Sequence, residues 1–437
     1  MRSRVRRILA LPPRLALALP LSLAVLWAGQ AAAAEHRAEA IFASERFAAA
    51  RAHLAADHDR TVDDIITLTE IPAPPFQEER RAGAYLDMLK AHGLFEIAMD
   101  AEGNVMGLRR GAGPQGGPVV VISAHLDTVF PAETDVTVRR EGTRLMAPGV
   151  GDDSRSLAVL LAFVRALDAA GVTTVHDLLV VGTVGEEGAG DLRGVRHLFQ
   201  TGAYKDRVTA FFSFDGTNPA ALVNGAVGSK RYRATFIGPG GHSYGAFGIV
   251  NPMAAMARAT ARLYEVEVPV TPRTTYSASV TGGGVSVNSI PAEVFTEYDM
   301  RSESPQALAD LEQRLLEILH VAVAEENAAR STAQGAVRLD ARVTGDRPAG
   351  GTPAEEPFIQ GVSAALRQLG FEPHLSASST DSNIPMSLGI PAVTLGSGGT
   401  GGRAHALDEW IDVEPVESVR GMAAGLLAVL TAAGVSD

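Results

Sequence analysis

Short apolar runs rich in β-branched residues alternate with helical segments through much of this chain, and that alternation limits the fold more than any other feature. Strands that alternate with helices in this way form a largely parallel sheet with helices on both faces. The sequence therefore predicts an α/β protein. The elements expected in the first half are helices at 36–60, 61–68, 77–94, 157–171 and 194–202 and strands at 119–123, 177–184 and 210–214.

The pattern changes between about residues 229 and 347. The elements expected there are strands at 230–237, 274–281, 293–301 and 336–344 and helices at 252–266 and 306–326. The order βαββαβ is typical of a ferredoxin-like α+β domain. A buried strand at 390–395 follows, so the first pattern resumes. We predict a main domain formed by 35–228 and 348–437, with 229–347 inserted into it as a second, smaller domain.

The amino terminus has the features of a secretory signal peptide. Arg2, Arg4, Arg6 and Arg7 are followed by an apolar run and by four alanines at 31–34. We therefore predict that residues 1–34 are a signal peptide and that the protein is exported, to the periplasm or the medium. Retention of the segment as a membrane anchor is the alternative, although Pro20 interrupts its apolar run.

The charge and the cysteine content of the chain limit the partners and metal ligands that it can have. The chain of 437 residues has a formal net charge of -12, and loss of 1–34 would remove five arginines and no acid, giving -17. Such acidity argues against nucleic acid and, once the signal peptide is removed, against an anionic membrane as partners. There are no cysteines. Any protein ligands of a metal must then be His, Asp or Glu.

Acidic and histidine side chains follow the predicted strands or precede a helix. His125 and Asp127 come directly after the first strand, where ligands of α/β sheets collect. Two residues apart on an extended chain, they point to the same side, as a metal ligand and the carboxylate that orients it would do. Four further segments, at other strand ends, before a helix or near the carboxyl end of the chain, carry similar side chains. These are Asp152, Asp153, Glu186, Glu187, Asp215 and His405.

Each segment also has a purely structural interpretation. Asp152 or Asp153 could cap the helix that follows, and Asp215 could stabilise a turn. The Glu186-Glu187 pair could be a solvated loop and His405 a surface histidine. Their joint occurrence at strand ends and helix starts favours two metal centres with nitrogen and oxygen ligands, which suits zinc.

These segments, together with Gly240-Gly-His242-Ser, resemble in order the two-zinc family of aminoacylases, acetylornithine deacetylase, glutamate carboxypeptidase and tripeptide aminopeptidase. The resemblance extends from about residue 60 to the end. It implies a zinc exopeptidase-like catalytic domain, a lid and dimerisation domain at 229–347, and two Zn²⁺ per chain, with Co²⁺ or Mn²⁺ as substitutes. It also implies a homodimer formed through the lid.

The resemblance assigns a role to each residue. Asp152 would bridge the two ions, His125 and Asp215 would complete one site, and Glu187 and His405 the other. Asp127 would orient His125, and Glu186 would be the general base. A pair of divalent ions activates a water and polarises a carbonyl, and a nearby carboxylate can take the proton.

The lid supplies further candidates by the same resemblance. His242 would stabilise the developing oxyanion, often from the opposite subunit of a dimer, and Asn288 would contact substrate. Arg301 could bind a substrate carboxylate through its planar guanidinium. Each could instead have a structural role, His242 and Asn288 in turns and Arg301 in a rim salt bridge. One departure is Ser154-Arg155-Ser156, where the family usually has Lys and Gly.

The predicted function is an exported zinc-dependent hydrolase that cleaves an amide bond in short peptides or N-acyl amino acids, as an exopeptidase of carboxypeptidase type. A tripeptide aminopeptidase or an N-acyl or N-carbamoyl amino acid amidohydrolase is the alternative. An inactive metal- or peptide-binding protein on the same fold would be expected if Glu186 or a ligand were missing, and none is.

Overall fold

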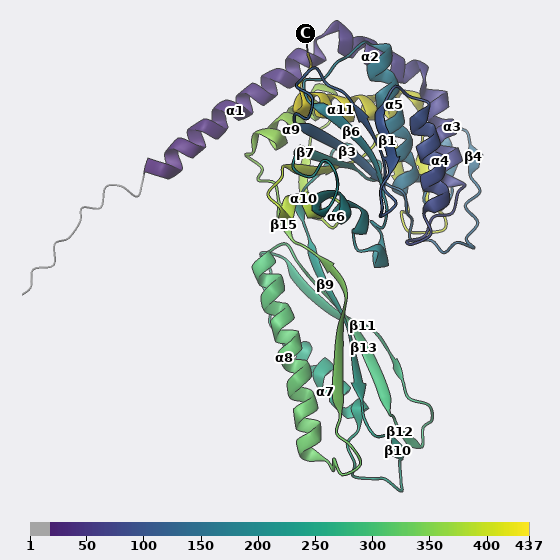
Figure 1. Ribbon diagram of the computed structural model, residues 1–437, viewed down its shortest axis with the longest axis vertical. Helices are drawn as coiled ribbons and strands as arrows, with labels where there is room; N and C mark the ends of the chain where they lie inside the picture. Colours follow the sequence, from purple (N-terminus) through teal and green to yellow (C-terminus); the bar gives the residue numbers. More distant parts are fainter. Residues whose placement is uncertain (1–17, 437) are drawn as a thin grey trace, which may run out of the picture.

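The computed structural model describes residues 18–436, which form a large α/β domain with an elongated smaller domain projecting from it (Figure 1). The arginines predicted to begin the signal peptide lie outside the described residues. The predicted cleavage point before Glu35 lies within helix α1, Ala18–Phe42.

The large domain is built on a nine-stranded sheet in the order β1-β2-β6-β3-β7-β17-β8-β15, with β16 paired to β8. Its centre is parallel, because β3 pairs in parallel with β6 and β7, and β7 with β17. The predicted mixed, largely parallel sheet is confirmed. Its strands are β1 Phe95–Met99, β2 Val105–Arg109, β3 Val119–His125, β6 Asp177–Thr183, β7 Val208–Phe214, β8 Ala221–Ala226, β15 Gly350–Gly351, β16 His374–Ser378 and β17 Ala392–Leu395.

Both faces of the sheet are covered, as alternation along β3 shows. Val120 and Ile122 pack into the larger apolar core, whereas Val119 and Val121 pack into a second core on the opposite face. Helices on the first face include α2 Glu45–Ala56, α3 His58–Thr69, α5 Arg155–Ala169, α9 Pro357–Gln368 and α11 Pro415–Ala433. Those on the second are α6 Arg193–Gln200 and α10 Asn383–Ser387. Helix α4 Glu79–Lys90 packs beside β1 and β2.

The single helix expected at 36–60 is wrong, since the chain breaks between α1 and α2. Ser44 caps the start of α2, its hydroxyl accepting the Phe47 N–H at 3.1 Å. A side-chain oxygen at such a position satisfies a backbone N–H that has no partner within the helix, so it favours a new helix start. The break lets α2 turn onto the core.

Helix α11 is the one helix among residues 18–436 that is long and apolar enough to cross a membrane. Within its most apolar window, 78% of the residues are buried inside the protein. Its composition therefore reflects a core position.

The small domain has a four-stranded antiparallel sheet in the order β11-β13-β9-β14. Alternate residues of β13, among them Val294, Tyr298 and Met300, are buried against the two helices that cover one face. Its elements are β9 Gly228–Ile237, β10 Gly241–His242, α7 Pro252–Leu263, β11 Thr274–Gly283, β12 Ser289–Ile290, β13 Glu293–Ser302, α8 Pro305–Ala329 and β14 Arg338–Arg347. The two-stranded sheet of β10 and β12 lies at the end of the lid away from the large domain (Figure 1).

A small sheet borders the carboxyl ends of the central strands. It has the order β18-β19-β5-β4 and brings the region before α5 next to the region around residue 410. Its strands are β4 Arg139–Glu141, β5 Arg144–Met146, β18 Thr400–Gly402 and β19 Trp410–Asp412.

Candidate metal centre

The parallel strands deliver the predicted ligands to one place. His125 is the last residue of β3, Glu186 and Glu187 follow β6, and Asp215 follows β7. Asp152 lies in the turn Val150–Ser154 just before α5, and the Asp152–Asp153 peptide bond is cis. His405 arrives from the loop between β18 and β19.

Three overlapping groups of side chains could each hold an ion, with ligand atoms within 4.8 Å of one another. They are His125 with Glu186 and Glu187; His125 with Asp153 and Asp215; and Asp152 with Glu187 and His405. The last group is the predicted second site. The first site differs from the prediction in one ligand. The group that contains His125 and Asp215 includes Asp153 and not Asp152, although Asp152 forms an ion-pair contact with His125.

Asp152 lies between the two histidines. Its Oδ1 is 2.9 Å from His125 Nε2, and its Oδ2 is 3.1 Å from His405 Nε2. Glu187 Oε1 is 3.0 Å from the same nitrogen of His405. This is the arrangement expected of a carboxylate that bridges two ions.

Two carboxylate oxygens at this centre are oriented for an ion better than for a hydrogen bond. Asp152 Oδ1 is buried without a hydrogen-bond partner although His125 Nε2 is so close, and Asp153 Oδ1 is likewise unpartnered. Atoms that converge without bonding one another are aimed at a shared third atom. The donor set of imidazoles and carboxylates suits zinc, manganese or cobalt.

Charge supports the same conclusion. Five carboxylates share this cluster with two imidazoles. Burial, with the nearby carboxylate of Asp152, raises the pKa of Asp215 to about 7. Hydrogen bonds to Asp152 and Glu187 raise the pKa of His405 to about 10. A cation would relieve this excess of negative charge.

The role of Asp127 differs from the prediction. His125 Nδ1 is 3.0 Å from the main-chain oxygen of Asp127 and 3.8 Å from its carboxylate oxygen. That carboxylate instead accepts the N–H groups of Glu186 at 3.0 Å and of Glu187 at 2.8 Å. Asp127 therefore orients His125 through its backbone, and its side chain fixes the Glu186-Glu187 turn.

Glu186 lies beside the cluster with its carboxylate buried. Burial raises its pKa well above the usual value, and the charges of His125 and Arg347 oppose that shift. A carboxylate of raised pKa near the ligands is suited to accept a proton at neutral pH.

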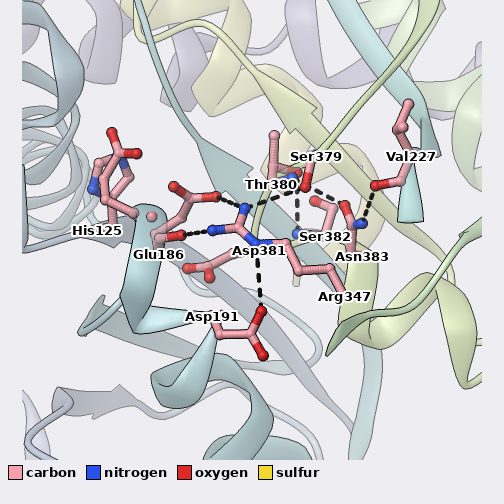
Figure 2. A network of polar contacts seen from close by, with 12 residues as sticks. His125, Glu186, Asp191, Val227, Arg347, Ser379, Thr380, Asp381, Ser382 and Asn383 are labelled. Atoms are coloured by element: carbon pink, nitrogen blue, oxygen red, sulfur yellow. Dashed lines mark hydrogen bonds and ion pairs between the residues drawn. The ribbon is translucent and has the colours of Figure 1, made fainter. Parts of the chain in front are cut away.

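Three residues that support this site were not predicted from the sequence. Glu409 accepts the N–H groups of Gly149 at 2.9 Å and Gly151 at 2.8 Å, and so shapes the loop before α5. Asp381 is buried and accepts the hydroxyl of Thr183 at the end of β6 at 2.6 Å. Arg347 contacts Glu186 (Figure 2). Of these three residues, only Glu409 could have been suspected from the sequence, because it lies four residues after the predicted ligand His405.

Arg155, where the sequence departs from the family pattern, is also buried. Its Nη2 donates to Ser418 Oγ at 2.8 Å, which ties the start of α5 to α11. Burial lowers the pKa of Arg155 to about 10.

Within one chain, the predicted lid residues do not reach the cluster. His242 and Asn288 lie together at the paired strands β10 and β12, where the Ser243 N–H donates to the main-chain oxygen of Asn288 at 2.9 Å. They line a hollow of about 710 Å³ at the far end of the lid.

Arg301 lies at the opposite end of the lid. Its Nε is 2.8 Å from Asp299 Oδ2, and it lines a cavity of about 260 Å³ between lid and large domain, together with Ser378 and Ser379. The prediction grouped Arg301 with Asn288 as substrate contacts. A single chain does not bring these two side chains together.

Residues 121–431 match the profile of peptidase family M20/M25/M40. The chain belongs to this family. Solved structures agree on the fold. Aminopeptidase PepT of Bacillus cereus is 18% identical with a TM-score of 0.68, over 85% of this chain and 98% of its own. The dipeptidase Dug1p of Saccharomyces cerevisiae is 16% identical with a TM-score of 0.66, over 90% of this chain and 99% of its own.

Human carnosine dipeptidase 1 shares the fold at 12% identity and a TM-score of 0.63, over 89% of this chain and 99% of that one. The Bacillus subtilis YxeP protein, a dinuclear metal-binding peptidase of the M20 family, is 16% identical with a TM-score of 0.62, over 86% of this chain and 99% of its own. At these identities the likeness establishes the fold alone, while the match to the family identifies this chain as an M20-type hydrolase.

Proposed function

We propose that this chain is an exported two-zinc hydrolase that cleaves an amide bond in short peptides or N-acyl amino acids, as an exopeptidase of carboxypeptidase type. The observation that carries the proposal is the position of Asp152 between His125 and His405. Two metal sites that share one carboxylate need such an arrangement.

In this proposal Asp152 would be a ligand of both ions, His125 and Asp215 would hold one of them, and Glu187 and His405 would hold the other. Asp153 lies close enough to take part in the first site, as the grouping with His125 and Asp215 indicates. When bound, the ions would lower the pKa of a water and polarise the scissile carbonyl.

Glu186 acts as the general base. Its carboxylate takes the proton of the attacking water and delivers it to the leaving amine. Consecutive side chains of an extended segment diverge, so Glu187 can face the metal while Glu186 faces the water. Asp127 holds the N–H groups of both residues and thereby fixes this division of roles.

The remaining groups come from the lid. We propose that the chain forms a homodimer through the lid and that His242 and Asn288 reach the partner's centre, because in their own chain they lie at the far end of the lid. Tyr244, 89% exposed, and Phe247, 83% exposed, lie in the turn that follows β10 and supply apolar surface for association. Arg301 would bind the substrate carboxylate.

The test combines metal analysis with a substrate panel. Purified protein should hold close to two zinc ions per chain and hydrolyse members of a panel of dipeptides, free-amine tripeptides and N-acyl amino acids. Glu186→Gln should retain the metal and lose hydrolysis by several orders of magnitude. Unchanged hydrolysis in Glu186→Gln, or a metal-free active protein, would refute the mechanism. Preference for tripeptides would favour the aminopeptidase alternative.

A further inference from the structure

The chain passes between its two domains twice, and one asparagine holds both crossings. Val227 lies between β8 and β9, and Pro348 lies between β14 and β15. Asn383 Nδ2 donates to the Val227 oxygen at 2.9 Å (Figure 2) and to the Pro348 oxygen at 3.0 Å. Its Oδ1 accepts the Thr380 N–H at 2.9 Å, and the side chain is fully buried. Both crossings are thus fixed to one point of the large domain.

Arg347, the last residue of β14, connects the lid to Glu186. Its Nη2 donates to the main-chain oxygen of Glu186 at 2.5 Å, and its Nη1 lies 3.4 Å from the carboxylate oxygen Oε1. Nη1 also donates to Ser379 Oγ at 3.2 Å. With 5% of its surface exposed, the guanidinium is held in this position (Figure 2).

The loop that follows Glu187 is also held by the lid. Arg231 Nη1, from β9, donates to the Gly188 oxygen at 3.1 Å. The Asp346 N–H, from β14, donates to both carboxylate oxygens of Asp191 at 3.0 Å. The loop that follows the Glu186-Glu187 pair is therefore held by two adjacent strands of the lid.

We propose that Asn383 and Arg347 are positioning residues that couple the orientation of the lid to Glu186. Asn383 holds the two crossings together and so fixes the axis about which the lid can rotate. Arg347 moves with β14, so a rotation of the lid displaces the guanidinium that holds the Glu186 main chain and carboxylate. The coupling rests on the proposed role of Glu186 as base, whereas the joint at Asn383 can be tested without substrate or metal.

The joint is tested by measuring the distance between the domains. Because the chain has no cysteine, Asp59→Cys in the large domain and Val270→Cys in the lid allow two spin labels. Both side chains are exposed. Labelled protein is diluted with excess unlabelled chain, so that electron–electron double resonance reports distances within one chain.

We expect Asn383→Asp, which cannot donate to the two carbonyls, to broaden or shift the distance distribution. The control is Asn327→Asp, since Asn327 makes a similar pair of bonds to Val337 entirely within the lid. Asn383→Ser replaces Asn383→Asp if that variant does not fold. An unchanged distribution in the Asn383 variant overturns the joint.

The coupling is tested by kinetics on the fastest substrate of the panel. Arg347→Met should lower kcat about 10- to 100-fold with KM unchanged, as expected for loss of a residue that orients a catalytic group. Arg347→Lys should restore part of kcat, because it keeps one charged donor. Arg233→Met, which removes an ion pair with Glu297 within the lid, should leave both constants unchanged.

A rise in KM with kcat unchanged would assign Arg347 to substrate binding and overturn the coupling. Wild-type values in Arg347→Met would overturn it as well. If no member of the panel is hydrolysed, the proposed function fails, and the distance measurement still decides on the joint.

Discussion

The carboxylate of Glu409 holds the backbone of Asp152: its Oε1 accepts the Asp152 N–H at 2.9 Å. The same side chain accepts the N–H groups of Gly149 and Gly151. Burial raises the pKa of Glu409 to about 7, and its three backbone hydrogen bonds oppose that shift. One carboxylate from the end of the chain thus shapes the loop that presents the bridging ligand.

Glu409→Gln should weaken zinc binding about 10- to 100-fold, the range typical of residues that orient metal ligands. The amide keeps one acceptor oxygen, but its NH₂ group then faces backbone N–H donors. Competition with a chelator measures the change. Glu414→Gln is the control, since Glu414 caps α11 and does not contact this loop. Equal affinity in wild type and Glu409→Gln would contradict the role.

Asp127→Asn should lower both zinc affinity and kcat, each about 10- to 100-fold. The carboxylate accepts two N–H groups, of which one belongs to the proposed base and the other to a ligand. Asp100→Asn is the control for the loss of a carboxylate that accepts backbone N–H groups. Asp100 accepts those of Glu102 and Gly103 in a turn away from the metal centre. Loss of kcat alone would place Asp127 with Glu186 and leave the ligand Glu187 unaffected.

Removal of the metal should destabilise the protein. A chelator should remove the metal more readily at low pH. A ligand at 100 times its Kd stabilises the folded state by about 2.7 kcal/mol, so chelation should lower Tm measurably. Without metal, burial raises the pKa of Asp215 to about 7, and hydrogen bonds to carboxylates raise that of His405 to about 10. An ion must displace these protons.

Zinc affinity should therefore rise with pH, by at least about tenfold per unit between about pH 5.5 and 7. The sign follows because both groups bind the metal only when deprotonated. Chelator competition at three pH values measures the slope. An affinity independent of pH over that range would exclude these two residues as ligands.

Arg81→Met should lower the free energy of unfolding by about 2–5 kcal/mol, because it leaves buried carbonyl groups without donors. Arg81 is fully buried, donates to the Ile71 oxygen at 2.6 and 3.0 Å, and donates to the Leu126 oxygen at 2.9 Å. Leu126 lies between His125 and Asp127, so the change should also loosen the site. Arg80→Met, at an exposed neighbouring position, should change stability by less than about 0.5 kcal/mol. Denaturant unfolding distinguishes the two.

Much of the centre was predictable because its residues lie at strand ends and helix starts. His125, Glu186, Glu187 and Asp215 each follow an apolar run whose period indicates a buried strand, and parallel strands end at one edge. The topology therefore brings them together whatever the loops do. The alternation in the lid strands was equally readable, as the buried residues of β13 show.

The residues that were missed act across long sequence separations. Arg347 contacts Glu186 and Asn383 contacts Val227 only because the lid returns to the large domain beside the place where it left. No periodicity marks such a contact. Asp127 was assigned to His125 from local spacing, and its carboxylate was instead taken by N–H groups sixty residues away, because a buried turn needs acceptors for its backbone donors.

Removal of residues 1–34 should change Tm little, because the buried side chains that the structure describes in α1 lie beyond the predicted cleavage point. Arg37 Nη1 donates to the Thr431 oxygen at 3.1 Å, and Ala38 and Ile41 are buried. A chain that starts at Ser44 should lose about 1.5–3 kcal/mol from the Ile41 side chain alone. Mass spectrometry of the exported protein should find Glu35 as its first residue. A mature chain that begins beyond Ile41, or one that retains residues 1–34 in the membrane, would contradict the predicted signal peptide.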